Sequence, residues 1–397
     1  MKLVLVIVMF GSFNLLAQTN DIRMFIFGNS LVHHEFQVNP TPSDETSVPH
    51  WLHFLSEAGE NSLEVAGQYG FLPQHANLPP FSQWGFDFAL PAWDSDNVSF
   101  AEANFSHILI TPGNFIQWQD PDVNYPYESI SPVSASNSVV EWCAAQEDGL
   151  NFYIYEGWPE MAPYLNAGFP PTDDEWDRFN EFLQTDYVDW FDQYHGMVME
   201  ANPDECLRII PVARLISRLL QQEPYDQIAI EQLYEDDAPH GRPSIYFLAS
   251  MITYMAMYEE EVPLDYMANE FIDPIIIDNY AAINSFFWNE LLNFNDENEN
   301  TKVFCKLNVA VDESASDASP VTLHPNPFGQ SFYIQNKEEE LLVKIFNGAG
   351  KMIRTEILKA GETKFDLTGY EDGIFFLKTV DRKGQILEFK KLVKISN

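Results

Sequence analysis

The feature that most constrains the fold is the alternation of short strand-like segments with longer helix-like ones. Five segments in the first 212 residues have the length and apolar content of buried strands: Met24–Phe27, Ser62–Ala66, His107–Thr111, Asn151–Tyr155 and Cys206–Val212. Helix-like segments lie between or after them: Trp51–Gly59, Leu215–Gln222, Ser244–Tyr258 and Ile275–Leu292. This alternation predicts an α/β domain whose parallel sheet is covered on both faces, with its site at the carboxyl ends of the strands.

The character of the chain changes near residue 295. Residues 309–320 are small and polar, as in a linker. Residues 321–397 contain alternating apolar positions separated by glycine turns, such as Asn347-Gly348 and Lys383-Gly384. The sequence therefore predicts a small all-β sandwich after the α/β domain.

The net charge of −39 is unevenly distributed. Residues 321–397 hold 12 of the 21 Lys and Arg but only 10 of the 60 Asp and Glu, so the acidic excess belongs to residues 1–320. A field of this sign repels phosphate backbones and anionic lipids. We therefore expect no nucleic-acid partner and no binding to an anionic membrane.

The N-terminus has the pattern of a secretory signal peptide over residues 1–17. Lys2 precedes the apolar run Leu3–Phe10, and Ala17 supplies a small residue. The run is shorter than the ~20 residues that span a bilayer. No other segment is long and apolar enough to be a membrane helix, so we expect a chain that does not span the membrane.

The three cysteines, Cys143, Cys206 and Cys305, form no zinc-binding pattern. One pair can be bridged in an oxidising compartment, or all three can be buried free thiols. The sequence leaves both alternatives open.

Two short blocks carry the residue types of a serine hydrolase. Ser30 follows the first strand-like segment on a turn with Gly28, and His240 stands three residues after Asp237. Histidine is the usual base for a serine nucleophile, and a carboxylate on its far nitrogen fixes its tautomer. Taken singly, each block is better explained as a helix cap or a surface loop.

Two further blocks contain candidate oxyanion donors. Asn114 follows the third strand-like segment, directly after Gly113, and Gly67 and Gly70 follow the second. An amide side chain or a glycine N–H at a strand end can donate to an oxyanion. A glycine after a strand is ordinarily only a turn residue.

In their order along the chain, the four blocks resemble the motifs of the SGNH (GDSL-like) hydrolases, esterases with a flavodoxin-like three-layer α/β/α fold. The G-D-S-L block is matched by Gly28–Leu31, the G-x-x-G block by Gly67–Gly70, the G-x-N block by Pro112–Asn114 and the D-x-x-H block by Asp237–His240. The resemblance covers about residues 22–295 and implies a hydrolase domain over residues 18–308. Asn29 replaces the usual Asp, and the spacer before Asn114 is missing.

The resemblance implies that Ser30 is the nucleophile, His240 the base and Asp237 its orienting acid. The Ser30 amide, the Gly70 amide and the Asn114 side chain become the oxyanion donors, with Gly67 as the alternative glycine. The implied reaction is ester hydrolysis through an acyl-enzyme, which needs no metal and no cofactor.

Other candidate sites are weaker. His33-His34-Glu35 and the pair His50 and His53 contain metal-ligating side chains, but neither forms a recognised ligand set. An aromatic stretch can form a platform for stacking sugars or can belong to the core. Its members are Trp84, Phe86, Phe88, Trp93 and Trp118.

The C-terminal module resembles the type A sorting domain of the type IX secretion system of Bacteroidota. The resemblance rests on His324–Phe328, Val343–Lys351, Phe365–Leu367, Gly373–Leu377 and Lys390–Lys394. It covers residues 321–397 and implies the type IX secretion machinery as a partner. We therefore expect a protein that is secreted or held at the cell surface.

Three functional hypotheses follow. The first is an exported ester hydrolase acting on a small-molecule or carbohydrate ester, with carbohydrate deacetylation as one form of it. The second is a catalytically silent SGNH domain that binds surface polysaccharide, and the third is a lipid esterase. The presence of Ser30, Asp237, His240 and Asn114 favours an enzyme, but nothing in the sequence decides between sugar and lipid esters.

Overall fold

The computed structural model describes residues 20–34, 47–86, 89–113, 116–268, 270–305, 321–326, 328–347, 352–370, 373–380 and 386–395. The chain divides into two compact units, residues 1–307 and 308–397. The predicted signal peptide (1–17) and linker (309–320) lie outside the described residues.

The first unit is built on a six-stranded parallel sheet, which confirms the predicted α/β class. Its strands are β1 (Asp21–Gly28), β2 (Ser62–Tyr69), β3 (Leu90–Pro91), β4 (His107–Ile110), β5 (Asn151–Tyr155) and β6 (Cys206–Ile210). Their order is β3-β2-β1-β4-β5-β6, so the chain adds strands first to one side of β1 and then to the other. In sheets of this doubly wound order, ligands bind at the carboxyl ends of the strands beside the point where the order reverses, which here lies between β1 and β4.

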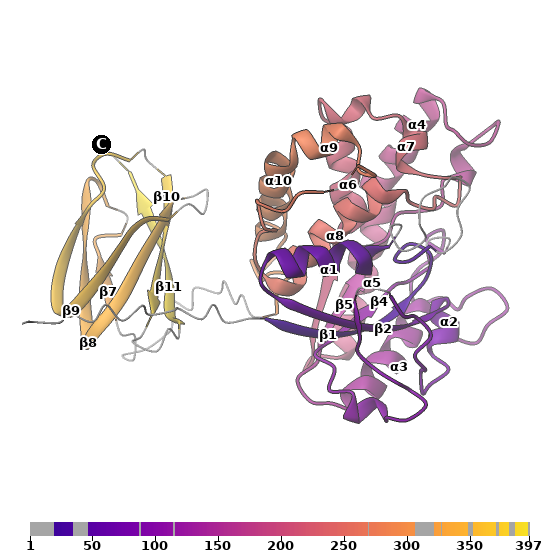
Figure 1. Cartoon of the computed structure of the whole chain (residues 1–397), viewed down its shortest axis with the longest axis horizontal. Coiled ribbons are helices and arrows are strands. Elements are labelled where there is room, and N and C mark those ends of the chain that lie inside the picture. Colours follow the sequence, from indigo (N-terminus) through magenta and orange to yellow (C-terminus); the bar gives the residue numbers. More distant parts are fainter. Residues whose placement is uncertain are drawn as a thin grey trace, which may run out of the picture. The chain divides into compact units, whose positions relative to one another are not determined.

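Helices cover both faces of this sheet, and Figure 1 shows α1 and α8 on one side and α3 on the other. Helices α1, α6 and α10 contact α8 in one layer, and α2 and α5 contact α3 in the other. The longer helices are α1 (Val48–Ala58), α3 (Pro132–Ala144), α4 (Asp173–Phe182), α5 (Val188–Ala201), α6 (Val212–Leu220), α8 (Pro243–Tyr258) and α10 (Tyr280–Leu292). The short ones are α2 (Leu72–His75), α7 (Ile230–Leu233) and α9 (Pro274–Asp278).

Helix α8 is the centre of its layer, because all of its residues are buried. It starts at Pro243, which suits the first turn of a helix because that N–H has no partner within the helix. An all-round apolar helix must be enclosed on every side, and the sheet together with α1, α6, α7 and α10 encloses it. The predicted helix Ile275–Leu292 is two helices in the structure, since Asn279 separates α9 from α10.

The segment Thr301–Cys305 lies along β6, the last strand of the sheet. The Ile209 amide donates to the Lys302 carbonyl at 2.9 Å, and the Arg208 side chain donates to the Phe304 carbonyl at 2.8 Å. These bonds satisfy backbone groups that an uncovered edge strand leaves open to pairing with another chain.

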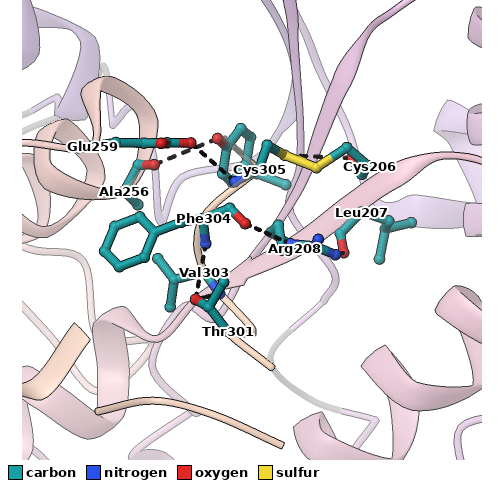
Figure 2. Close-up of a disulfide and its surroundings, with 10 residues drawn as sticks. Cys206, Leu207, Arg208, Ala256, Glu259, Thr301, Val303, Phe304 and Cys305 are labelled. Carbon is teal, nitrogen blue, oxygen red and sulfur yellow. Dashed lines mark hydrogen bonds between the residues drawn. A yellow bond between two sulfur atoms is a disulfide. The ribbon is translucent and has the colours of Figure 1, made fainter. Parts of the chain in front are cut away.

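A disulfide between Cys206 and Cys305 fastens this segment to the start of β6 (Figure 2). The two Cα atoms are 5.8 Å apart, and the Cys305 amide also donates to the Glu259 carboxylate at 3.0 Å. Of the two alternatives left open by the sequence, the structure therefore contains one bridged pair. Cys143 remains a buried free thiol.

The second unit is a five-stranded antiparallel sheet. Its strands are β7 (Val321–His324), β8 (Ser331–Asn347), β9 (Met352–Asp366), β10 (Gly373–Val380) and β11 (Ile386–Lys394). The order is β11-β10-β8-β7, and β9 pairs with the other edge of β8. The described strands thus form one hydrogen-bonded sheet around a separate apolar core, rather than the two sheets of the expected sandwich.

Removing the disulfide should destabilise the first unit. The bridge joins residues separated by 99 positions, so it restricts the unfolded chain strongly. We expect Cys206→Ser combined with Cys305→Ser to lower the free energy of unfolding by about 2–4 kcal/mol, the usual range for a disulfide. Urea denaturation measures this change. A reductant should weaken the wild type but not the double variant, and equal stability without reductant would contradict the prediction.

Candidate active site

The turn after β1 presents Ser30 at the carboxyl end of the sheet. The Asn29 side-chain oxygen accepts the Leu31 amide at 3.0 Å, and the Asn29 carbonyl accepts the Val32 and His33 amides at 3.1 and 3.2 Å. These bonds need only an acceptor oxygen on residue 29, so Asn serves as well as the expected Asp. Asn29 is buried, whereas Ser30 is half-buried.

Close packing and one hydrogen bond fix the position of the turn that carries Ser30. A Cβ on Gly28 would lie 2.9 Å from the Trp84 ring, so no larger residue fits at the end of β1. The hydroxyl of Tyr246, from α8, donates to the Ser30 carbonyl. The turn that carries Ser30 is therefore held both by the segment after β2 and by the helix that follows His240.

Hydrogen bonds between its two ends hold the loop that carries His240. Tyr234 and Gly241 form an antiparallel bridge, and the Glu235 amide donates to the His240 carbonyl at 2.8 Å. The indole N–H of Trp158, which follows β5, donates to the Pro239 carbonyl at 2.7 Å. This framework holds His240 at the carboxyl end of the sheet.

Asp236 orients the His240 ring. One carboxylate oxygen accepts the Ala238 and His240 amides at 3.1 and 3.0 Å, and the other lies 2.7 Å from His240 Nδ1. Partial burial raises the pKa of Asp236, but the bonds from His240 and the loop amides outweigh it and hold that pKa below its ordinary value. The carboxylate is therefore charged at neutral pH. Because it occupies Nδ1, Nε2 is the ring nitrogen of His240 that makes no hydrogen bond to any residue the structure describes.

This geometry corrects the expected acid partner, Asp237. The Asp237 carbonyl accepts the Met161 and Ala162 amides at 2.9 and 3.1 Å, and its carboxylate makes no hydrogen bond among the described residues. The physical reason is the tight turn of the loop, which directs the carboxylate of Asp236 toward the ring. The carboxylate that contacts His240 therefore comes from the residue four positions before it, and not from the residue three positions before it.

Ser30 and His240 line the same cavity, which has a volume of about 310 Å³. The remaining lining residues come from the turn after β1, from the last residue of β2 and from the segment that follows β2: His33, His34, Tyr69, Gln83 and Trp84. The structure thus brings together the predicted nucleophile and base, which are 210 residues apart in the sequence.

His34 stacks on His240, with ring centroids 4.0 Å apart and an interplanar angle of 12°. Burial, and then the charge of His240, lower the pKa of His34 to about 4. His34 is therefore neutral at neutral pH, and its ring packs against one face of the His240 ring. Its Nε2 lies 3.4 Å from the buried carboxylate of Glu235.

Neither predicted glycine donates into the cavity. The Gly70 amide donates to the Gly28 carbonyl at 2.9 Å. In a strand, the N–H and C=O of one residue point to the same edge, and successive residues alternate. Gly67 therefore faces the opposite edge of β2, where its carbonyl accepts the Gln83 and Trp84 amides at 2.8 and 3.0 Å.

Asn114 lies outside the described residues, so its role as an oxyanion donor stays a prediction. The chain reaches it from β4, whose continuation is bonded to β1 through the Thr111 amide and the Phe27 carbonyl at 2.9 Å. The Gly113 carbonyl accepts the Gln117 side chain at 2.7 Å.

The other candidate residues have different surroundings. His50 and His53 lie on α1 with their rings against Phe54, and Glu35 lies outside the described residues. Within the described ranges, no group of three or more His, Cys, Asp or Glu is arranged to hold a metal ion. Trp84, Phe86 and Trp93 are buried, Phe88 is not described, and Trp118 is 71% exposed.

Sequence reasoning missed four residues of this site. Asp236 is adjacent to the aspartate that matched the motif, and His34 belonged to a pair considered only for metal binding. Gln83 and Tyr246 carry no motif at all. Their contacts with Tyr69 and Ser30 join segments distant in sequence, so spacing gives no signal for them.

The family of the C-terminal unit is established by sequence. Residues 322–395 match the family described as the secretion system C-terminal sorting domain. This confirms the predicted sorting module, and it means that the chain is exported to the cell surface or secreted. Among the helices that the structure describes, none combines the length and the apolar character needed to cross a membrane. No protein with a curated description matches the chain.

Three solved structures show the range of structural likeness. A DUF3244 protein from Bacteroides vulgatus with an immunoglobulin-like β-sandwich is 12% identical over 20% of this chain and 88% of its own, with a TM-score of 0.18. PorZ, a surface component of the type IX secretion system of Porphyromonas gingivalis, is 17% identical over 21% of this chain and 12% of its own, with a TM-score of 0.17. A carbohydrate esterase family 2 enzyme from Corynascus thermopiles is 11% identical over 61% of this chain and 67% of its own, with a TM-score of 0.29. These scores are too low to support an argument.

The two neighbouring aspartates provide a matched test of the site. Asp236→Asn should lower kcat for ester hydrolysis by about 10³- to 10⁴-fold, because an amide at this position no longer stabilises the His240 imidazolium or fixes its tautomer. Asp237→Asn should leave kcat near the wild-type value, since among the described residues Asp237 is bonded through its backbone carbonyl and not through its carboxylate. Steady-state kinetics of both variants measure the difference. The reverse pattern would restore Asp237 as the orienting acid.

Proposed function

We propose that the first unit is a serine ester hydrolase of the SGNH type. The observation that carries the proposal is the shared cavity of Ser30 and His240, with the far nitrogen of His240 bonded to the Asp236 carboxylate. The strand order supports it, because leaving out the two-residue β3 gives the 2-1-3-4-5 order of flavodoxin-like sheets. Ser30 follows β1, next to the point where that order reverses.

In the proposed reaction, His240 Nε2 accepts the proton of the Ser30 hydroxyl while the Ser30 oxygen attacks the ester carbonyl. The tetrahedral intermediate collapses, its bond to the alcohol oxygen breaks, and His240 returns the proton to that oxygen. Water, deprotonated by His240, then attacks the acyl-enzyme. The bond between the acyl carbon and the Ser30 oxygen breaks, and His240 returns the proton to that oxygen, which releases the acid and free Ser30. Asp236 stays charged throughout and stabilises the imidazolium.

The cavity favours short acyl groups carried by polar alcohols. Its described lining consists of histidines, Ser30, Gln83 and the two aromatic residues Tyr69 and Trp84, and it includes no aliphatic side chain to hold an acyl chain. Tyr69 is 44% exposed beside it and offers a ring face to a sugar. We therefore favour acetyl esters of carbohydrates over lipid esters as substrates.

A fluorophosphonate probe should label Ser30, and Ser30→Ala should abolish both the label and the turnover of acetyl esters. His240→Ala should reduce turnover by a similarly large factor, because the members of a triad act as a unit. Mass spectrometry of the labelled peptide and hydrolysis assays measure these effects.

The same assays separate the alternatives. Release of acetate well above the release of long-chain acids supports a carbohydrate deacetylase, and the opposite preference indicates a lipid esterase. A folded wild-type protein that neither takes the label nor hydrolyses any ester of the panel would identify a silent binding domain.

The two units should divide the work between them. A chain limited to residues 18–308 should fold and keep full ester turnover, since Ser30, Asp236 and His240 all belong to the first unit. In the native host, deletion of residues 321–397 should leave the enzyme in the periplasm, and residues 309–397 fused to a periplasmic reporter should export that reporter. Cell fractionation measures both. Normal secretion of the truncated enzyme would contradict the sorting role.

A further inference from the structure

The backbone amides at the end of β2 do not supply the oxyanion donor that the proposed reaction needs. An ester hydrolase needs preorganised donors where the oxyanion develops. The Gly70 amide is bonded to Gly28, Gly67 faces the other edge of its strand, and the Tyr69 amide is bonded to the Gln83 side chain at 3.0 Å. Hence the end of β2 directs none of these three amides toward an oxyanion.

Gln83 is held in a defined position at this end of the sheet. Its backbone amide donates to the Gly67 carbonyl at 2.8 Å, and its side-chain oxygen accepts the Tyr69 amide at 3.0 Å. Two anchors, one on the main chain and one at the tip of the side chain, restrict the rotamers between them. The side chain is thus ordered before any substrate binds, although the residue is exposed.

The anchored oxygen determines which part of the Gln83 amide remains for a ligand. A primary amide carries one acceptor oxygen and two N–H donors in one plane. The oxygen is taken by Tyr69, and Nε2 makes no hydrogen bond within the described part of the chain. Because Gln83 lines the cavity together with Ser30 and His240, these donors are available to a bound ester.

We propose that Gln83 Nε2 donates a hydrogen bond to the oxyanion of the tetrahedral intermediate, in the role expected of the Gly70 amide. The proposal rests on the proposed function of the same cavity. The Gln83 proton stays on its nitrogen, so no bond of Gln83 forms or breaks. The donor acts because a fixed N–H stabilises the negative oxygen of the intermediate more than the neutral carbonyl of the substrate.

Two substitutions at Gln83 separate this role from simpler ones. Gln83→Met keeps the length of the side chain and removes both the donors and the oxygen that holds Tyr69. Gln83→Glu keeps an oxygen for the Tyr69 amide and removes the donors, but it adds a charge. Gln74→Met and Gln74→Glu are the matched controls, because the Gln74 oxygen likewise accepts a backbone amide, that of Phe71, and Gln74 does not line the cavity.

We expect both Gln83 variants to lower kcat for an acetyl ester by about 10²- to 10³-fold with little change in KM, the usual effect of removing one oxyanion donor. Affinity for a boronate, which forms a tetrahedral adduct on the serine, should fall in parallel. Both Gln74 variants should keep the wild-type kcat. If kcat falls in Gln83→Met but not in Gln83→Glu, the role of Gln83 is only to hold the Tyr69 amide. If kcat falls only in Gln83→Glu and salt restores it, the effect comes from the added charge near the site, and Gln83 is not a donor.

The wild-type protein distinguishes failure of this proposal from failure of the function. If the wild type hydrolyses the ester and labels at Ser30 while both Gln83 variants match it, the oxyanion role of Gln83 is overturned and the hydrolase stands. If the folded wild type neither labels nor turns over, both proposals are overturned together.

Discussion

The pairing of β1 with β2 on one side and β4 on the other is the constraint on which the rest of the structure depends. It buries β1 completely from Met24 to Gly28 and fixes where the strand must end. At that end the Gly28 carbonyl accepts the Gly70 amide and lies 3.2 Å from His75 Nε2. With those bonds made, the chain leaves the sheet through the Asn29 turn and carries Ser30 to its carboxyl edge.

The elements that could be predicted are those whose burial leaves a pattern in the sequence. Five of the six strands of the first unit were predicted because both of their faces are covered, which makes them short apolar runs, whereas the two-residue β3 was missed. Helix α8 was predicted because it is enclosed on all sides. Helices α3, α4 and α5 were missed, since they are only partly buried and their apolar residues are interspersed with polar ones. A local signal did exist for α4, where Thr172 and Glu175 form a capping box.

The sequence motifs predicted which segments form the candidate site, but not which side chains and amides make its contacts. Asp236 and Asp237 are adjacent carboxylates before the same histidine, and only the folded loop decides which one meets the ring. The glycine donors depend on strand register, because the pairing of Gly28 with Tyr69 determines the edge that each residue of β2 faces. A single sequence does not contain that register. Gln83 belongs to a segment without motif or periodicity, so its position depends entirely on bonds to β2.

The disulfide described above also has a mechanical consequence. Cys305 is the last residue of the first unit that the structure describes, and the sorting domain follows it along the chain. Residues 207–304 lie inside the covalent loop closed by Cys206 and Cys305. The sulfur–sulfur bond therefore gives a covalent path from the sorting domain to the start of β6 that bypasses α6 to α10 and the loop that holds His240.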